Sequence, residues 1–334
     1  MATIDDVARA AGVSRSTVSY VLSGKRTIST ETRRRVEQSI RALGYRPHAG
    51  ARALASSRTN VLALVIPLRT EVNVAVVMQF VASIAQHARR HDHDVLLLTK
   101  DEGAEGLRRA AGTAMCDGII VMEIEASEPR VPVLNSLSLP SVLIGVPDDT
   151  RGLPCVDLDF EATGQTCVNH LADLGHTEIA LVAPAPEVYQ RGTSFARRFL
   201  RGYTTTARDR GVHATVYPCG SRYDAAAACL DQILAEQPGV TGLVVHNEAA
   251  MHALLTSLRE RGIRIPQDIS IIAICPDDVA ENQAVELTSV AIPVDEVSRV
   301  AVDMAMERVV GPTRAEIRLI SPHVTQRFST APPR

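Results

Sequence analysis

Residues 3–24 read TIDDVARAAGVSRSTVSYVLSG, and this stretch decides the architecture of the N-terminal part of the chain. Thr3 and Asp6 form the T-x-x-D pattern of an N-cap followed by an acid in the first helical turn. The apolar residues that follow recur on one helical face, so a first helix is expected over residues 4–11. Gly12 can adopt the positive φ that ends a helix within one residue. A very short turn to the next element is therefore predicted.

Two further helices complete this segment. Ser14 is a good N-cap for a second helix over residues 15–23, which should bury Val18, Val21 and Leu22. Ser29 can cap a third helix that runs to Gly44, with an inner face formed by Val36, Ile40 and Leu43. Two helices joined by so tight a turn form a helix-turn-helix, the motif that places a recognition helix in the DNA major groove.

The outer face of the second helix is expected to carry hydrogen-bonding side chains. Arg15 can pair with guanine in a bidentate manner, and each such contact discriminates by roughly 1 to 3 kcal/mol. Hydroxyl groups are better suited to phosphates, which position the protein without specifying sequence; those expected to do so are Ser14, Thr17, Ser19 and Thr32. A plain three-helix bundle is the alternative, but it does not explain why the outer face of the second helix is polar.

The charge distribution supports a nucleic-acid partner for this segment. The whole chain of 334 residues has a net charge of −3. Residues 1–60, however, contain eleven Lys or Arg against four acids, a surplus of seven positive charges, which leaves −10 for the remainder. A small basic module on a larger acidic body fits phosphate binding by the module and another task for the body. A merely solvated basic face is the alternative.

The stretch 3–24, followed by STETRRRVEQSIRALGYRPHAGARALAS, closely resembles the headpiece of the lactose and galactose repressor (LacI/GalR) family, without a gap as far as about residue 58. The resemblance implies that the base-reading positions are Arg15, Ser16 and Tyr20. It also implies that residues 47–56 fold on DNA as a hinge helix in the minor groove. Ala51 and Arg52 would belong to that hinge, and Leu54 would be its wedge between base pairs. A passive linker is the alternative.

From residue 60 onward, short apolar runs alternate with amphipathic helical stretches, as far as ISIIAIC at 269–275. Strict alternation predicts parallel sheets with helices on both faces, and a dozen strands exceeds one open sheet, so two sheets are expected. The segments LADLGHTEIALVAP and RFSTAPP extend the family resemblance to nearly the whole chain. The body should therefore resemble a two-lobed type I periplasmic binding protein, with a small-ligand cleft at the carboxyl ends of the strands.

The expected fold is thus a small all-α headpiece followed by an α/β two-lobed domain. The headpiece takes residues 1–46, the hinge or linker 47–58, and the effector-binding and dimerisation domain 59–334. Within that domain the lobes are expected at roughly 59–160 with 290–320, and at 161–289 with 321–334.

The ligand cleft departs from the family pattern. The family's effector-contacting arginine, three residues before a Gly-Tyr or Gly-Phe pair, corresponds here to Phe199, with Arg198 and Arg201 beside it. The family's effector-binding aspartate corresponds to Cys275. Asp277 and Asp278 could replace it if the loop is re-routed, although solvated loop acids are the preferred interpretation, and Glu248 after Asn247 offers a further hydrogen-bonding group. The residues expected to line the site are Phe80, Phe160, Phe199, Asn247 and Cys275. A carbohydrate effector is what the resemblance implies, although aromatic stacking surfaces are scarce.

Several classes of protein are disfavoured. No Gly-rich dinucleotide or phosphate loop, nucleophile elbow or catalytic triad spacing is present, so neither enzyme activity nor a cofactor is expected. The six cysteines lie far apart without metal-ligand spacing, so no metal site is expected and the thiols should be reduced and buried. The N-terminus has no signal-peptide pattern and no apolar run reaches membrane-spanning length, which predicts a cytoplasmic location without membrane contact.

These observations predict a transcriptional regulator that binds a palindromic operator in double-stranded DNA as a homodimer and responds to a small molecule. Repression is the preferred interpretation of its action, and activation is the alternative. One alternative is an effector-independent DNA-binding regulator with a vestigial cleft. A solute-binding receptor is a second alternative, but export would require a signal peptide.

Overall fold

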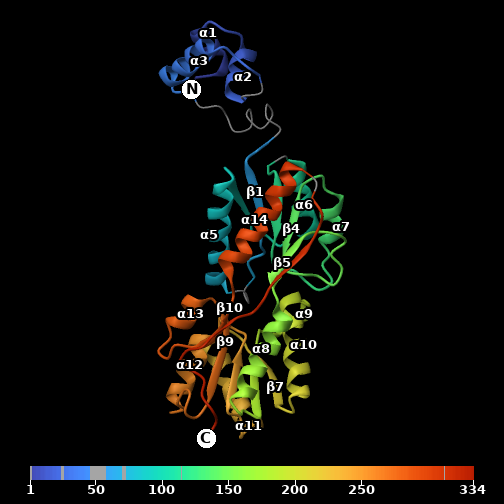
Figure 1. Ribbon diagram of the computed structural model, residues 1–334, viewed down its shortest axis with the longest axis vertical. Coiled ribbons are helices and arrows are strands. Elements are labelled where there is room, and N and C mark those ends of the chain that lie inside the picture. Colours follow the sequence, from blue (N-terminus) through green and yellow to red (C-terminus); the bar gives the residue numbers. More distant parts are fainter. Residues whose placement is uncertain (1, 24–25, 46–57, 70–72, 114, 312) are drawn as a thin grey trace.

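In the computed structural model, the described residues are 2–23, 26–45, 58–69, 73–113, 115–311 and 313–334. The headpiece, at the top of Figure 1, is a separate cluster of three helices, and the two lobes of the α/β body follow below it. The expected hinge residues Ala51, Arg52 and Leu54 lie outside the described residues.

The headpiece helices have the predicted bounds: α1 Ile4–Ala11, α2 Arg15–Ser23 and α3 Thr30–Leu43. Thr3 and Asp6 form a reciprocal capping box at the start of α1. The amide of Thr17 donates to Ser14 Oγ at 3.2 Å, so Ser14 caps α2 as expected. Gly12, with φ 63°, ends α1 in the left-handed conformation, which permits the tight turn.

One headpiece core residue was predicted wrongly. Val36 is fully buried and Ile40 packs against the core, but Leu43 is 40% exposed. Gly44 adopts φ 57° directly after Leu43, and the reversed chain places Tyr45 in the core instead. The left-handed turn at Gly44 therefore places Tyr45, rather than the last helical residue Leu43, in the headpiece core.

The first lobe contains a six-stranded sheet with helices on both faces. Its strand order is β11-β5-β4-β3-β1-β2, all parallel, with bounds β1 Val61–Val65, β2 Asp94–Leu98, β3 Gly118–Val121, β4 Ser141–Ile144, β5 Cys155–Leu158 and β11 Ile317–Ile320. Its helices are α5 Val74–Arg90, α6 Gly103–Gly112, α7 Val131–Ser136 and α14 Val294–Val310. In Figure 1, α5 and α14 lie beside each other on this lobe, and their apolar residues share one core cluster.

The second lobe repeats the arrangement. Its sheet has the order β12-β10-β9-β8-β6-β7, parallel except for the pairing of β12 with β10. The strands are β6 Glu178–Ala183, β7 His213–Pro218, β8 Gly242–Val245, β9 Ser270–Cys275, β10 Thr288–Ala291 and β12 Val324–Thr325. The helices are α8 Phe160–Asp173, α9 Pro186–Gln190, α10 Ser194–Asp209, α11 Tyr223–Glu236, α12 Met251–Glu260 and α13 Asp277–Glu281. The prediction of two largely parallel sheets is confirmed.

The chain passes between the lobes after β5, after β10 and after β11, as the strand orders require. The lobes also touch directly, because the amide of Ser194 donates to Ile124 O at 2.9 Å and the amide of Ala126 donates to Gly192 O at 2.8 Å. All six cysteines are buried free thiols, as predicted. Over the described ranges, no helix has the length and apolar character needed to cross a bilayer.

Candidate DNA-binding surface and ligand cavity

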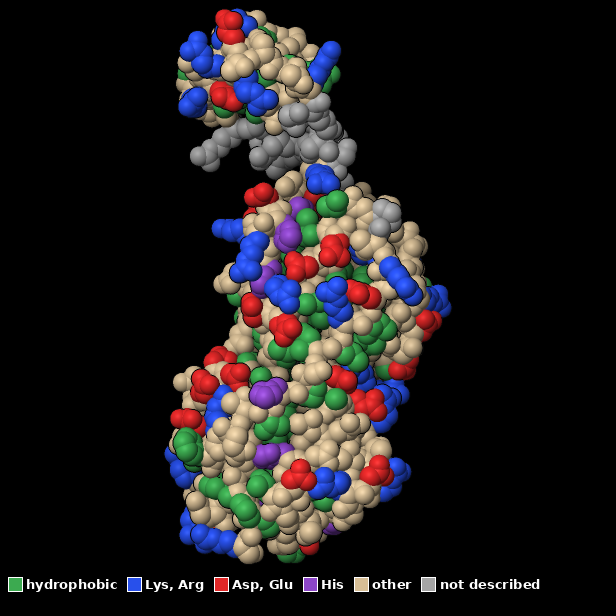
Figure 2. All heavy atoms as spheres, viewed as in Figure 1, with side chains coloured by type: hydrophobic (Ala, Val, Ile, Leu, Met, Phe, Trp, Pro, Cys, Tyr) green, Lys and Arg blue, Asp and Glu red, His purple; other side chains and the backbone are tan. Residues whose placement is uncertain are grey.

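The start of α2 presents the predicted base-reading residues at the surface. Arg15 and Ser16 are exposed and Tyr20 is 36% exposed, whereas Val18 on the opposite face is fully buried. The Arg26 guanidinium lies 5.8 Å from the centre of the Tyr20 ring, so a cation covers the ring that faces solvent. Figure 2 shows that Lys and Arg side chains outnumber acidic ones on the visible face of the headpiece.

The predicted phosphate-contacting hydroxyls are partly engaged within the headpiece. Ser14 Oγ lies 2.8 Å from Ser16 Oγ and 2.9 Å from Thr17 Oγ1. Ser29 donates its hydroxyl to Thr32 Oγ1 at 2.9 Å. Thr17, Ser19 and Thr32 are half-buried. A hydroxyl that accepts one hydrogen bond can still donate another, so these groups keep the capacity to contact phosphate oxygens.

A cavity of about 160 Å³ lies between the lobes. Its wall is built largely from residues that directly follow parallel strands: Met122, Glu123 and Ile124 after β3, Gly145 after β4, Pro184 and Ala185 after β6, and His246, Asn247, Glu248 and Ala249 after β8. Helix α5 contributes Val76, Val77 and Phe80. The prediction that the cleft lies at the carboxyl ends of the strands is confirmed.

Three of the five predicted cleft residues line this cavity, namely Phe80, Phe160 and Asn247. Phe199 and Cys275 do not line it, which corrects that part of the prediction. Phe199 faces inward from α10, is fully buried and packs behind His246 with ring centroids 4.1 Å apart. Cys275 is the last residue of β9 and is fully buried in the core on the other face of that sheet.

Three of the polar groups considered from the sequence, Asn247, Asp277 and Asp278, are already bonded. Asn247 donates from Nδ2 to Cys219 O at 2.6 Å and accepts from the amide of Ala250 at 3.2 Å, so its side chain holds the loop after β8 in place. Asp277 accepts from Arg327 at 3.0 Å and Asp278 accepts from Gln79 at 2.9 Å. Neither aspartate lines the cavity.

An aromatic group forms one side of the cavity. Phe160 and Phe195 lie 5.3 Å apart, and the His246 ring lies 5.7 Å from Phe160 and 5.6 Å from Phe195. Burial lowers the pKa of His246 to about 3, so the imidazole is neutral at physiological pH. Its Nδ1 atom is buried without a hydrogen-bond partner among the described residues.

Three acidic residues belong to the wall: Glu123 and Asp157, which were missed in the sequence analysis, and Glu248, which was considered there as a hydrogen-bonding group after Asn247. Burial raises the pKa of Asp157 to about 7, although Arg198 opposes the shift through a 2.8 Å ion pair. Burial also raises the pKa of Glu248 to about 7, and the negative charge of Glu123 adds to that shift. The available signal was the position of each acid at the end of an apolar run, as in GIIVME, CVDL and GLVVHNE.

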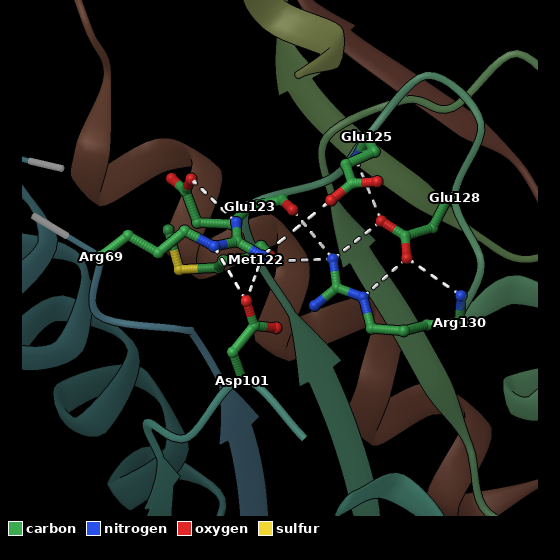
Figure 3. Close-up of polar contacts among 7 residues, drawn as sticks. All are labelled: Arg69, Asp101, Met122, Glu123, Glu125, Glu128 and Arg130. Atoms are coloured by element: carbon green, nitrogen blue, oxygen red, sulfur yellow. Dashed lines mark hydrogen bonds and ion pairs between the residues drawn. The ribbon is translucent and has the colours of Figure 1, made fainter. Parts of the chain in front are cut away.

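Glu123, which lines the cavity, belongs to a charged network that Figure 3 shows in close-up. Arg69 lies 2.8 Å from Asp101, 3.9 Å from Glu125 and 4.0 Å from Glu123. Burial raises the pKa of Glu123, and the positive charge of Arg69 opposes that effect. Glu123 has the unusual φ of 55°, which turns the chain sharply at the end of β3.

A buried ion pair between Arg130 and Glu128 stabilises the turn at Glu123. Arg130 donates to Glu128 Oε1 at 2.7 Å, and its Nη2 donates to Met122 O at 3.1 Å and to Glu123 O at 2.9 Å. The Arg130 guanidinium thus holds both the Glu128 side chain and the backbone of the cavity wall at Met122 and Glu123. Among the described residues, no group of His, Cys, Asp and Glu has the arrangement of a metal site.

Comparisons with known proteins agree with this architecture. Residues 3–48 match the family of bacterial regulatory proteins, lacI family, and residues 168–330 match the periplasmic binding protein-like domain. Catabolite control protein A of Priestia megaterium is 28% identical, with 90% of each chain covered. The HTH-type transcriptional repressor PurR of Vibrio cholerae is also 28% identical, with 92% of each chain covered. The solved transcriptional regulator CelR–cellobiose complex superimposes with a TM-score of 0.70 at 25% identity, covering 98% of this chain and 100% of that one.

A helix-turn-helix headpiece joined to a two-lobed periplasmic binding protein-like body defines a DNA-binding transcriptional regulator rather than an enzyme. The chain thus combines a lacI-family helix-turn-helix domain with a periplasmic binding protein-like domain.

Proposed function

We propose that this regulator is a homodimeric repressor that binds a palindromic operator. Its affinity for the operator falls or rises when a small molecule occupies the cavity between the lobes. The cavity carries the ligand part of the proposal, because its wall combines residues of both lobes with buried polar groups. A ligand acts here through its different affinity for the DNA-competent and DNA-incompetent arrangements of the lobes. The related CelR was solved with cellobiose, and the related PurR is named a repressor.

In the headpiece, we assign base reading to Arg15, Ser16 and Tyr20, which the exposed start and outer face of α2 support. The phosphate contacts are assigned to the hydroxyls of Ser14, Thr17, Ser19 and Thr32. The minor-groove contacts of Ala51, Arg52 and Leu54 rest on the sequence resemblance alone. Because the proposed target is chromosomal DNA, we place the protein in the cytoplasm.

The experiment begins with selection of DNA fragments by the purified full-length protein, followed by sequencing. A two-fold symmetric consensus is expected, together with a dimeric mass in sedimentation. Recovery of an asymmetric consensus, or a monomeric mass at the concentration that saturates DNA, would contradict the homodimer.

The ligand part is tested separately. A panel of metabolites, sugars and amines among them, is titrated calorimetrically and then added to the protein–operator complex. At least one compound should bind with a stoichiometry of one per chain and change operator affinity in parallel. If none binds, the chain is an effector-independent regulator.

A further inference from the structure

The cavity wall is mainly apolar. Phe80 approaches from α5, Phe160 and Phe195 from the second lobe, and aliphatic side chains complete the wall, including Val76, Val77, Met122, Ile124, Ile144 and Val188. With a volume of about 160 Å³, this space suits a compact ligand with an apolar body.

The wall offers few free groups to a polyhydroxylated ligand. The Asn247 amide is bonded to backbone groups on both its nitrogen and its oxygen. Asn73 Oδ1 accepts from the amide of Ala75 at 3.1 Å as the cap of α5. Asp157 is held by Arg198 at 2.8 Å. A sugar needs several hydrogen-bond partners around its ring, and polar groups that stay unpaired on burial lower affinity.

Glu248 differs from the other acids of the wall in lacking a cation. Glu123 has Arg69 at 4.0 Å, and the Arg191 charge also favours ionisation of Glu123. No ion pair or hydrogen bond joins the Glu248 side chain to another side chain within the described residues, and the charge that acts on it is the negative one of Glu123. A hydrogen bond from its own backbone amide favours the ionised form of Glu248, but burial and the charge of Glu123 oppose it, so a positive charge beside this carboxylate would be stabilised.

His246 provides the second observation. Only 3% of this residue is exposed, it lines the same cavity, and its Nδ1 atom has no hydrogen-bond partner among the described residues. Because burial keeps the ring neutral, His246 cannot itself supply the charge that Glu248 lacks. A neutral imidazole nitrogen can, however, accept a hydrogen bond from a ligand, which for the buried Nδ1 atom requires the ring to turn toward the cavity.

We propose that the cavity binds a small ligand carrying a protonated amine on an apolar body, with Glu248 as the counter-ion and His246 as a neutral hydrogen-bonding neighbour. The three N–H donors of an ammonium group match a carboxylate and an imidazole nitrogen, and the aromatic faces of Phe160 and Phe195 attract a cation as well as an apolar ring. This inference rests on the proposed function, because it names the chemical class of the effector for the same cavity.

The test compares two isosteric probes, benzylamine and benzyl alcohol, with D-glucose as a third. Each is titrated into the full-length protein by calorimetry at about pH 8, where most of the amine remains protonated and Glu248 is largely ionised. Benzylamine should bind about tenfold or more tightly than benzyl alcohol, since a hydrogen bond to a charged group is worth more than one between neutral groups.

Two variants test whether Glu248 causes the preference for benzylamine over benzyl alcohol. Glu248→Gln keeps the size of the side chain and removes its charge, so it should abolish the preference for the amine. Glu105→Gln makes the same charge change on the exposed surface of α6, outside the cavity, and should preserve it.

Equal affinity for the two probes, a preference that persists in Glu248→Gln, tighter binding of glucose, or binding of none of the three would overturn the inference. Each of these results leaves the proposed function open to its own test, because that test asks whether any metabolite changes operator affinity.

Discussion

Arg198 and Asp157 form an ion pair with 2.8 Å between Nη1 and Oδ2, and this pair joins helix α10 of the second lobe to strand β5 of the first. Arg198 also lies 3.6 Å from Asp159 and donates to Leu158 O at 3.4 Å. One guanidinium therefore binds the segment through which the chain first crosses between the lobes. Its neighbour Phe199 packs into the core of the second lobe. Arg198 thus connects the two lobes, whereas Phe199 fills the interior of the second lobe.

Removing the Arg198 charge should be strongly destabilising. Arg198→Met leaves Asp157 buried without its cation, and we expect a loss of about 3–5 kcal/mol in the free energy of unfolding at high pH. The loss should be smaller at pH 6, because the raised pKa of Asp157 lets the carboxyl group bind a proton and become neutral. Urea denaturation at pH 6 and about pH 8.5 measures both values.

Arg201→Met is the matched control for that variant. Arg201 lies about one helical turn after Arg198 and pairs with Glu161 of α8. Its side chain is 62% exposed, so its removal should cost less than about 1 kcal/mol. Similar losses in both variants would mean that the pair between the lobes contributes no more than a surface ion pair.

The close crossing of α8 and α10 should depend on glycine. A Cβ atom at Gly202 would overlap the carbonyl oxygen of Glu161, and one at Gly164 would overlap that of Phe199. Gly202→Ala should therefore destabilise the second lobe by about 1–3 kcal/mol or more, because backbone atoms have to separate. Thermal unfolding monitored by circular dichroism measures the loss.

Gly112→Ala is the control for Gly202→Ala and should not destabilise the protein. Gly112 is the last residue of α6, and a Cβ atom there meets no other group within 4 Å. The change should be neutral or stabilising by up to about 1 kcal/mol, since alanine restricts the unfolded chain more than glycine does. A stable Gly202→Ala protein would show that the two helices can move apart freely.

His246 should make the protein sensitive to acid. Its pKa is lowered to about 3 in the folded state from 6.5, so the unfolded chain binds a proton that the folded chain excludes. The contribution to stability is complete above pH 6.5 and is lost as the pH falls from 6.5 toward 3. Between pH 7.5 and 5, wild type should lose about 2 kcal/mol that His246→Phe retains.

For this comparison His252→Gln serves as the control, because His252 is exposed on α12. That variant should follow the wild-type pH profile. Parallel profiles for wild type and His246→Phe would show that the buried imidazole does not couple protonation to folding.

Arg15→Ala should relax specificity at one symmetric pair of base pairs in the selected operator. Loss of a bidentate contact to guanine costs roughly 1–3 kcal/mol per contact, while binding to unrelated DNA should change little. Gel mobility shift with operators substituted at each position provides the measurement. A uniform loss across all sequences would instead assign Arg15 to a phosphate.

Leu54→Ala tests the predicted minor-groove wedge. Partial unstacking of a base step costs a few kcal/mol and is recovered only on a site that the protein bends. Specific binding should therefore weaken far more than non-specific binding, and DNA bending, measured by fluorescence energy transfer between the operator ends, should decrease. Equal losses for both kinds of DNA would contradict the wedge.

The sequence by itself determined the headpiece and the class of the body. Capping residues, left-handed glycines and short apolar runs act locally, so the bounds of α1 and α2 and the two parallel sheets could be predicted from Thr3, Gly12, Ser14 and the alternation after residue 60. Even there, the exchange of Leu43 for Tyr45 in the core depended on how the chain turned after α3.

The cavity was decided by the tertiary structure. Glu123, Asp157, His246 and Glu248 come from three strand ends that are far apart in the sequence, and their protonation depends on burial and on neighbours such as Arg69 and Arg198. Phe199 and Cys275 occupied suggestive positions in the sequence, yet side-chain direction placed both in the cores. Burial and charge compensation are properties of the folded arrangement, and no local pattern of residues encodes them.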